Sequence, residues 1–442
     1  MGIKDRIAAT GAAFGALKAM GRDPSSLKFE TISSPTEARL EGRPITLFGT
    51  NNYLGLTFDP GCVQAAADAT FAQGAGTTGS RIANGSYGGH NALETEIARF
   101  YGKRGAMVFS TGYVANIGMI SVLGGQGDHL LIDADSHASI YDGCKMSDAE
   151  IIRFRHNSPE SLAKRLERLK GTPGDKTVIV EGIYSMLGDS APIDEFAAVT
   201  REAGDDVFLM VDEAHSLGVY GATGRGKAQA DGVEADCDFI VGTFSKSVGT
   251  TGGYCVSDLE GFDALRMLSR PYMFTASMTP SAIATARAAF EIMAAGRGHK
   301  ERLWKNANHL YSGAQSLGFQ TGPEVSPVVA VILPEPQVAV ALWNRLIDEG
   351  IYTNIAIPPA TPNALSLLRV SVSAAHEPDQ IDHALDVLAS VGAELGIIDG
   401  ATPIKKKVGA ASLRVISGGA SAKAAGSEQP VRRAKGRAAP TA

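Results

Sequence analysis

Short apolar runs recur through the middle of the chain, separated by segments whose apolar residues fall on one helical face. The runs are rich in Val and Ile and lie at residues 106–110, 129–133, 177–182, 207–212 and 238–244. Such continuous runs are typical of strands buried on both faces of a parallel sheet. Residues 158–171 show the helical pattern, with Leu162, Leu166 and Leu169 on one face. The alternation predicts a large α/β domain with a mostly parallel central sheet over residues 50–280.

The pattern changes on either side of this domain. A long Ala-rich helical segment at 281–296 leads into two strand-like segments, 326–334 and 367–376. These predict a smaller C-terminal α/β domain over residues 281–398. Residues 1–49 are predicted to form a helical and extended N-terminal segment. Residues 399–442 are dominated by Ala, Gly, Ser and basic side chains, a composition typical of a disordered tail.

Composition and charge exclude several classes of protein. The chain has 442 residues and a net charge of -6, so nothing in its overall balance indicates nucleic-acid binding. Its four cysteines are far apart and have no cluster of histidines beside them, which predicts buried thiols in a reducing compartment and no metal site. No apolar run approaches the ~20 residues of a membrane span, so a cytoplasmic protein is expected. Two interpretations of the basic tail stay open: weak attraction to an anionic membrane surface, or solubility alone.

Polar side chains stand at the carboxyl ends of the predicted strands, where ligands of open α/β sheets collect. Gly112 and Tyr113 follow the first run, where their amides are suited to hold a phosphate at a helix N-terminus. His137 follows the second run and Ser185 the third. Each of these residues alone is also consistent with an ordinary structural role.

Two further strand ends carry charge. Asp212 ends a very apolar run, and His215 follows in the loop. A buried carboxylate requires a cationic partner, either a protein cation or the protonated nitrogen of a heteroaromatic cofactor. Lys246 follows the next run, together with the hydroxyls of Thr243 and Ser245. It is either a surface cation or a buried nucleophile with a depressed pKa beside a phosphate site.

Taken together, these motifs resemble those of the α-oxoamine synthases, a family of fold-type I pyridoxal-phosphate enzymes. The resemblance covers about residues 45–395 and is carried by NNYLGL, SRIANGSYGGH, STGYVAN, DADSHASIYDG, EGIYSMLGD, VDEAHSLGVYG, GTFSKSVGTTGGY and LLRVSVSAAH. It implies the cofactor pyridoxal 5′-phosphate, a large domain followed by a smaller one, and a homodimer with active sites at the subunit interface.

The resemblance also implies a role for each matching residue around the cofactor ring. Lys246 is expected to bind the cofactor aldehyde covalently and to act later as a general base. Asp212 is expected to pair with the pyridinium nitrogen, which keeps the ring an effective electron sink. His137 is expected to stack on the ring face, and His215 and Ser185 to lie near its phenolic oxygen.

The cofactor phosphate has its own expected partners. The resemblance assigns it to the backbone amides of Gly112 and Tyr113 and to the hydroxyls of Thr243 and Ser245. Thr275 is expected to reach this phosphate from a second subunit.

The family implies a decarboxylating condensation between an amino acid and an acyl thioester. Asn52 and Arg369 are expected to hold the amino-acid carboxylate, for which a planar guanidinium is well suited. The segments GTFSKSVGTTGGY, RPYMFTASMTPS and PPATPNALSLLR look most like the bacterial branch that converts L-serine and a long-chain acyl-CoA or acyl-ACP into 3-ketodihydrosphingosine, the first step of sphingolipid synthesis. Ala360 stands where some relatives carry threonine, so substrate contacts there stay open.

Two alternatives remain at the level of sequence. One is another branch of the family, which joins glycine or alanine to a different acyl-CoA. The other is a non-catalytic partner subunit, which the presence of Lys246, Asp212 and His137 argues against.

Overall fold

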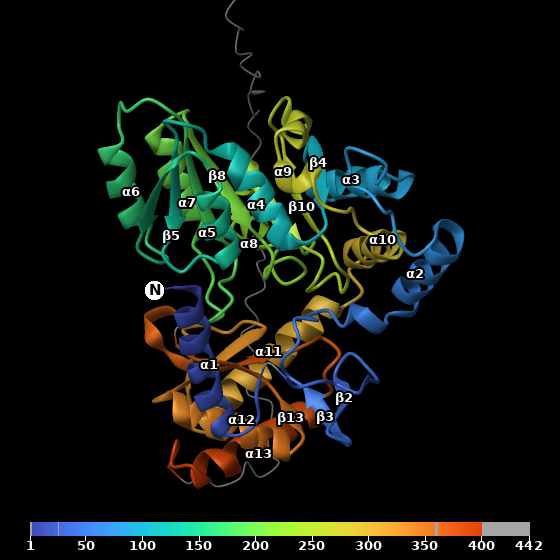
Figure 1. Cartoon of the computed structure of the whole chain (residues 1–442), viewed down its shortest axis with the longest axis vertical. Coiled ribbons are helices and arrows are strands. Elements are labelled where there is room, and N and C mark those ends of the chain that lie inside the picture. Colours follow the sequence, from blue (N-terminus) through green and yellow to red (C-terminus); the bar gives the residue numbers. More distant parts are fainter. Residues whose placement is uncertain (1, 25, 359–360, 400–442) are drawn as a thin grey trace, which may run out of the picture. The chain divides into compact units, whose positions relative to one another are not determined.

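The computed structural model describes residues 2–24, 26–358 and 361–399. Its largest element is a seven-stranded sheet in the order β4-β10-β9-β8-β7-β5-β6, which Figure 1 shows between helices. The strands, in this order, are β4 (Gly105–Phe109), β10 (Gly253–Ser257), β9 (Phe239–Thr243), β8 (Val207–Asp212), β7 (Lys176–Glu181), β5 (His129–Asp133) and β6 (Glu150–Phe154). The predicted mostly parallel sheet is therefore present.

Two strands of this sheet, β6 and β10, were not predicted from the sequence. β10 pairs antiparallel with both β4 and β9, whereas β9, β8, β7, β5 and β6 pair in parallel. β10 is completely buried, but its sequence GYCVS contains one Val and no Ile, so it lacks the Val- and Ile-rich signature. β6 lies at the edge of the sheet and is largely exposed, so its sequence EIIRF is not a continuous apolar run.

Helices cover both faces of the sheet and close two hydrophobic cores. Alternate residues of one strand point to opposite sides: Val178 and Val180 of β7 belong to one core, and Ile179 belongs to the other. The helices around this sheet are α2 (Pro60–Gln73), α3 (Gly88–Tyr101), α4 (Gly112–Leu123), α5 (Ala138–Lys145), α6 (Pro159–Arg168), α7 (Ile193–Ala203), α8 (Lys227–Ala230), α9 (Arg270–Met273) and α10 (Pro280–Ala294).

The predicted helix at 158–171 illustrates how local sequence sets an element. The Ser158 side chain accepts a hydrogen bond from the Ser161 amide, and Pro159 occupies the first turn of α6. Leu162 and Leu166 are buried, and Leu169 packs partly buried against the same core. The helix ends before Gly171, which adopts a positive φ of 76°.

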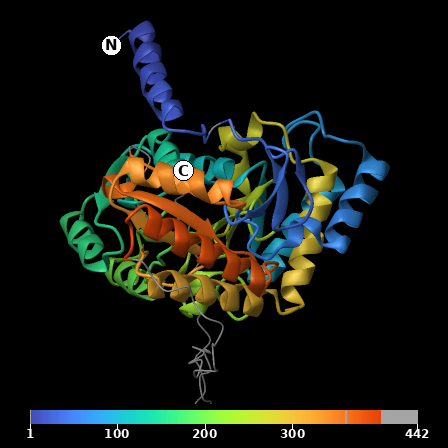
Figure 2. The same ribbon diagram turned by 90° about the horizontal axis from the view of Figure 1, so that it is seen from below.

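The C-terminal part has its own antiparallel sheet in the order β11-β12-β15-β14. Its strands are β11 (Gln320–Thr321), β12 (Val328–Leu333), β15 (Ser366–Ser371) and β14 (Asn354–Ala356), and its helices are α11 (His299–Ser316), α12 (Pro336–Asp348) and α13 (Pro378–Glu394). α13 packs against α11 and α12, and these helices are the gold to red ribbons of Figure 2. Every residue of β15 is buried, so the polar side chains of Arg369 and Ser371 face the protein interior and not water.

The N-terminal strands join a strand from the C-terminal part. β1 (Thr31–Ile32), β2 (Glu37–Leu40) and β3 (Arg43–Leu47) form a sheet with β13 (Ile351–Tyr352), which runs parallel to β3. The N-terminal helix α1 (Ile3–Ala19) precedes them, with Ile3 and Ile7 each 67% exposed. Within the described residues, no helix has the length and apolarity that a membrane crossing requires.

Candidate active site

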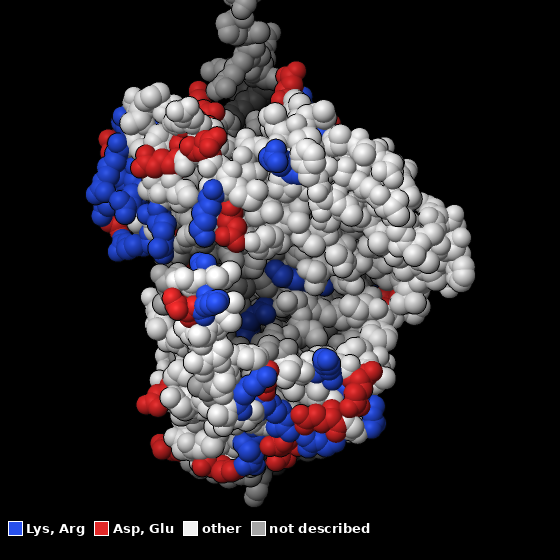
Figure 3. All heavy atoms as spheres, in the orientation of Figure 1, with Lys and Arg blue, Asp and Glu red and all other residues white. Residues whose placement is uncertain are grey.

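Four adjacent parallel strands end at one edge of the large sheet and bring the predicted residues together. β5, β7, β8 and β9 end at Asp133, Glu181, Asp212 and Thr243 respectively. In the register of the sheet, Glu181 lies beside Asp212, and Asp212 lies beside Val241 of β9. Figure 3 shows a hollow in the molecular surface with Lys and Arg side chains deep inside it. A cluster of buried polar groups at such an edge is a candidate site.

Asp212 is a buried carboxylate held by neutral donors. Its Oδ2 accepts a hydrogen bond from Asn116 Nδ2 at 2.7 Å, and its Oδ1 accepts one from the Ala214 amide at 2.8 Å. Among the described residues, no Lys, Arg or His nitrogen lies within 4.0 Å of it to form a salt bridge. Because burying an unpaired carboxylate is costly, Asp212 is suited to pair with a cationic group of a ligand.

His137 begins helix α5 and is fixed through both its backbone and its ring. Its amide donates to Glu181 Oε1 at 2.5 Å, and its Nδ1 lies 2.7 Å from Ser139 Oγ. Burial lowers the pKa of His137, although the negative charge of Asp212 opposes this effect. Burial, reinforced by the charge of Asp212, raises the pKa of Glu181 well above its ordinary value. The ring of His137 is therefore neutral and firmly oriented.

Lys246 follows β9 in the turn that the sequence GTFSKS encodes. Its side chain is half-buried, and burial lowers the pKa of its amine to about 8. The positive charge of Arg369 lowers this pKa further, whereas the negative charges of Asp212 and Glu181 raise it. A substantial fraction of the amine is then neutral near physiological pH, as a nucleophile or a general base requires.

The end of β9 lies close against the N-terminus of α4 and forms a candidate phosphate site. A Cβ on Gly112, the first residue of α4, would lie only 2.6 Å from Thr243 Cβ, so a side chain would clash there. The Thr243 and Ser245 hydroxyls lie 2.9 Å apart, and Ser245 is exposed. The free amides at the start of α4, including that of Tyr113, and these two hydroxyls are of the kind that binds phosphate oxygens.

His215 and Arg369 meet through a tyrosine that the sequence analysis did not single out. Tyr53 Oη lies 2.7 Å from His215 Nδ1 and accepts a hydrogen bond from Arg369 Nη2 at 3.3 Å. The same Nη2 donates to Asn51 Oδ1 at 2.9 Å. Burial, with the positive charges of Lys246 and Arg369, lowers the pKa of His215 well below its ordinary value. The imidazole is therefore neutral.

Two buried polar groups at this site lack partners. Arg369 is 9% exposed, and its Nε has no hydrogen-bond partner within the described part of the chain. Asn52 donates from Nδ2 to Thr57 Oγ1 at 2.7 Å, but its buried Oδ1 is equally without a partner there. Buried polar atoms are rarely left unsatisfied, so these atoms are suited to a polar ligand such as a carboxylate.

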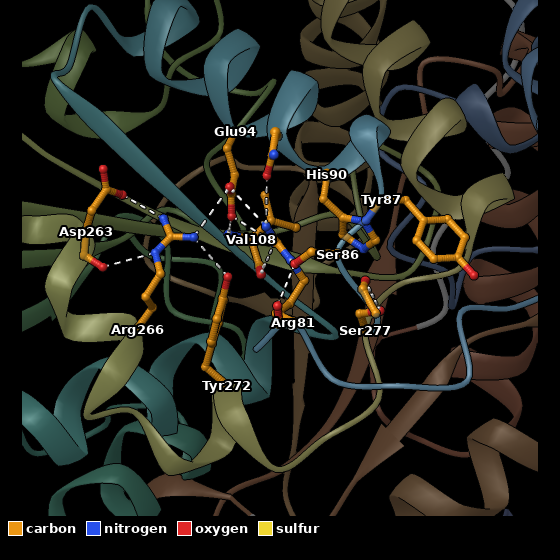
Figure 4. A network of polar contacts seen from close by, with 12 residues as sticks. Arg81, Ser86, Tyr87, His90, Glu94, Val108, Asp263, Arg266, Tyr272 and Ser277 are labelled. Atoms are coloured by element: carbon orange, nitrogen blue, oxygen red, sulfur yellow. Dashed lines mark hydrogen bonds and ion pairs between the residues drawn. The ribbon is translucent and has the colours of Figure 1, made fainter. Parts of the chain in front are cut away.

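Thr275 lies beside a closed network of polar side chains. It lines a small cavity with Arg81, Ser110, Tyr272 and Ser277. In this network, shown in Figure 4, Arg81 Nη1 donates to Glu94 Oε1 at 2.8 Å. The expected reach of Thr275 into a second subunit stays a prediction. Ser185 is half-buried in the loop after β7, and its contact with the cofactor also stays a prediction.

Comparison with known proteins identifies the family. The model for aminotransferase class I and II matches residues 43–388. The serine palmitoyltransferase of Caulobacter vibrioides is 54% identical over 406 residues, which are 92% of this chain and 99% of the relative. The chain belongs to the class I and II aminotransferases. Among solved structures, serine palmitoyltransferase from Sphingomonas wittichii is 48% identical with a TM-score of 0.87, over 90% of this chain and 100% of that one.

A second solved structure bears on the cofactor. It is described as SPT with PLP internal aldimine, and it is 46% identical with a TM-score of 0.87, over 90% of this chain and 100% of that one. The predicted fold, family, enzyme class and cofactor, pyridoxal 5′-phosphate, are thereby confirmed. The residues present fit this cofactor, because the partners of the Asp212 carboxylate are neutral and the Thr243 and Ser245 hydroxyls lie 2.9 Å apart against the start of α4.

Several residues of the site escaped sequence reasoning although they lie inside the quoted motifs. Asn116 is in STGYVAN, Glu181 is in EGIYSMLGD, and Tyr53 is in NNYLGL. Each contacts a predicted site residue from a different strand or loop. The motifs that contain them were visible in the sequence, but the partner of each residue was not.

Proposed function

We propose that this enzyme condenses L-serine with a long-chain acyl thioester, carried on CoA or on acyl carrier protein, and releases carbon dioxide and the free thiol of the carrier to form 3-ketodihydrosphingosine. The observation that carries the proposal is that the site contains both a half-buried amine, Lys246, and a buried guanidinium, Arg369. The Nε of Arg369 lacks a partner among the described residues. The first group is suited to base chemistry and the second to an amino-acid carboxylate.

In this proposal, separate residues hold the aldehyde, the ring nitrogen, the ring face and the phenolic oxygen of the cofactor. Lys246 binds its aldehyde, Asp212 pairs with its ring nitrogen, and His137 stacks on its face. His215 and Ser185 lie by its phenolic oxygen. Pyridoxal phosphate supplies an electron sink for negative charge that develops on the α-carbon of the amino acid. The buried Asp212 supports this role because its partners, Asn116 and Ala214, neutralise none of its charge.

The phosphate of the cofactor lies at the start of α4. The amides of Gly112 and Tyr113 and the hydroxyls of Thr243 and Ser245 donate to it, and Thr275 of a second copy of the chain completes the set. The close contact between Gly112 and Thr243 supports this placement, because it brings a helix N-terminus and two hydroxyls to one point.

The protein groups then handle the amino acid. Arg369 and Asn52 bind its carboxylate, so that the α-proton faces Lys246. Once the amine of the amino acid has replaced it on the cofactor aldehyde, Lys246 Nζ, with its pKa lowered to about 8, would be free to remove that proton. His215, kept neutral by burial and linked to Arg369 through Tyr53, orients the guanidinium without adding a second positive charge.

A homodimer is part of the proposal. Met267, Leu268 and Phe274 are 60%, 62% and 74% exposed, around the elements η3 (Phe262–Met267) and α9, which contact each other. Figure 3 shows a broad region without charged side chains on the half of the molecule that carries α9 and α3. Exposed apolar patches of this kind mark interfaces. We expect light scattering to give twice the mass of one chain.

The proposed location is the cytoplasm, with weak contact to the inner membrane surface. Cys62, Cys144, Cys237 and Cys255 are all free and buried, which supports a reducing compartment. The basic tail, the proposed source of membrane attraction, lies outside the described residues, as does Ala360. Binding of the full chain and of a chain ending at residue 400 to anionic vesicles, at two salt concentrations, tests this contact.

A substrate panel tests the function. The purified enzyme is assayed with serine, glycine and alanine against acyl-CoA and acyl-ACP of increasing chain length. We expect the highest kcat/KM with serine and a long acyl chain. A higher value for glycine or alanine with a short acyl-CoA would place the chain in another branch of the family, and no turnover with bound cofactor would indicate a non-catalytic subunit.

A further inference from the structure

A second buried charged cluster lies next to the active site. His156, in the loop between β6 and α6, bridges two carboxylates: its Nδ1 is 2.8 Å from Asp133 Oδ1, and its Nε2 is 2.7 Å from Asp189 Oδ2. The Asp133 side chain is 0% exposed and that of Asp189 is 9% exposed. Both ring nitrogens are therefore used, and each binds a carboxylate from a different loop.

The neighbouring residue reinforces the bridge. Asn157 donates from its amide to Asp133 Oδ2 at 2.8 Å and from Nδ2 to Asp189 Oδ2 at 2.9 Å. Its φ is 47°, in the left-handed region that non-glycine residues seldom adopt. The ring of Tyr184 packs edge-on against the ring of His156, with 4.5 Å between the two ring centroids. The surrounding structure thus fixes both His156 and Asn157 in place.

The two carboxylates belong to the loops that carry site residues. Asp133 ends β5, and the chain reaches His137 four residues later. Asp189 follows Ser185 by four residues, in the loop after β7. The His137 loop is tied to β7 by the hydrogen bond to Glu181, and His156 adds a direct tie between the two loops.

Charge explains why an imidazole stands between them. Burial lowers the pKa of His156, but the hydrogen bonds to Asp133 and Asp189 outweigh this and raise it to about 10. The ring is therefore an imidazolium that compensates two buried carboxylates. Among the described residues, no group of three or more His, Cys, Asp or Glu side chains is arranged to hold a metal ion, so the cluster is not a metal site.

We propose that His156 is a positioning residue, which fixes the loops of His137 and Ser185 relative to each other and so orients the cofactor ring. The inference rests on the proposed placement of these two residues at the cofactor, but not on the identity of the amino-acid or acyl substrate. His156 acts through Asp133 and Asp189, the two carboxylates that it contacts.

Two substitutions separate the two halves of the bridge. In His156→Asn the amide nitrogen takes the place of Nδ1 and keeps the bond to Asp133. In His156→Gln it takes the place of Nε2 and keeps the bond to Asp189. We expect His156→Gln, which breaks the bond to Asp133 at the start of the His137 loop, to raise the dissociation constant for pyridoxal phosphate about tenfold, as a lost charged hydrogen bond implies. We also expect it to weaken the visible circular dichroism of the bound cofactor, with a smaller effect for His156→Asn.

The measurement uses the full chain, freed of cofactor and titrated with pyridoxal phosphate, with the melting temperature recorded for each variant. His309→Gln is the matched control, because it alters a surface imidazole whose Nε2 is 2.9 Å from Asp382. Cofactor affinity and circular dichroism equal to wild type in both His156 variants would overturn the proposal. If either variant fails to fold, Asp189→Asn keeps the shape and neutralises one end of the bridge, and unchanged affinity there is equally contradictory.

Discussion

Arg81 and Lys246 are both cations in the interior of the large domain, but their surroundings differ. All three guanidinium nitrogens of Arg81 have hydrogen-bond partners, among them Ser86 Oγ at 2.9 Å and both carboxylate oxygens of Glu94 at 2.8 and 3.1 Å. Around Lys246, by contrast, Arg369 and Asn52 keep buried polar atoms without partners in the described part of the chain. A closed network of charges stabilises the fold, whereas an open one is prepared for a ligand.

The largest expected effect comes from removing the amine of Lys246, at the centre of the open network. Lys246→Ala should lower the turnover rate about a thousandfold or more, because both the covalent attachment point and the general base are lost. The free energy of unfolding of the cofactor-free protein should not fall, since a partly buried cation is removed. Steady-state kinetics and urea unfolding measure the two quantities. Lys170→Ala, at a lysine side chain that is 75% exposed, serves as the control and should change neither.

A substitution in the closed network around Arg81 should instead lower the free energy of unfolding. Arg81→Met leaves the buried Glu94 carboxylate without its main partner and should lower the free energy of unfolding by about 3–5 kcal/mol. Arg345→Met, which breaks an exposed pair with Glu394, should cost less than about 1 kcal/mol. Urea unfolding compares the two variants. An Arg81 variant as stable as the Arg345 variant would show that the closed network contributes little to the fold.

Arg369 tests the difference between the two networks, because it is buried like Arg81 but belongs to the open network around Lys246. Arg369→Lys should raise the KM for serine about 10- to 100-fold, since a planar two-pronged contact with a carboxylate is lost. Its melting temperature should stay close to that of wild type, because the lysine ammonium can still donate to Asn51 and Tyr53, as Nη2 does, and Nε has no protein partner to lose within the described residues. A large drop in melting temperature with an unchanged KM would place Arg369 with Arg81 as a structural residue.

The smallest effect concerns the pH dependence of stability at the His156 bridge. The pKa of His156 is raised from 6.5 to about 10, so its stabilising contribution is complete below pH 6.5 and is lost as the pH rises toward 10. Asp133, Asp189 and Asp135 are the charged groups that interact with it, and Arg153 in turn interacts with Asp135. We expect His156→Gln to flatten the fall in melting temperature over this pH range. An equally steep fall in the variant would contradict the assigned charge state.

Much of this architecture follows from the sequence, for physical reasons that also set the limits. β5, β7, β8 and β9 are buried on both faces, so their apolar runs were visible, and their ends gave Asp212 and Lys246 directly. β6 and β10 lack such runs, the first because it is an exposed edge and the second because its sequence GYCVS contains one Val and no Ile. Asn116, Glu181 and His156 act through partners distant in the chain, and pairings of that kind have no local signature.

The central claim is that Lys246 is the covalent attachment point of pyridoxal phosphate. Borohydride reduction of the cofactor-loaded protein, followed by proteolysis and mass spectrometry of the peptides, tests it most directly. We expect a pyridoxyl group on the peptide that contains Lys246 and none on that peptide in Lys246→Ala. A wild-type peptide without the label, or a label on another lysine, would contradict the account.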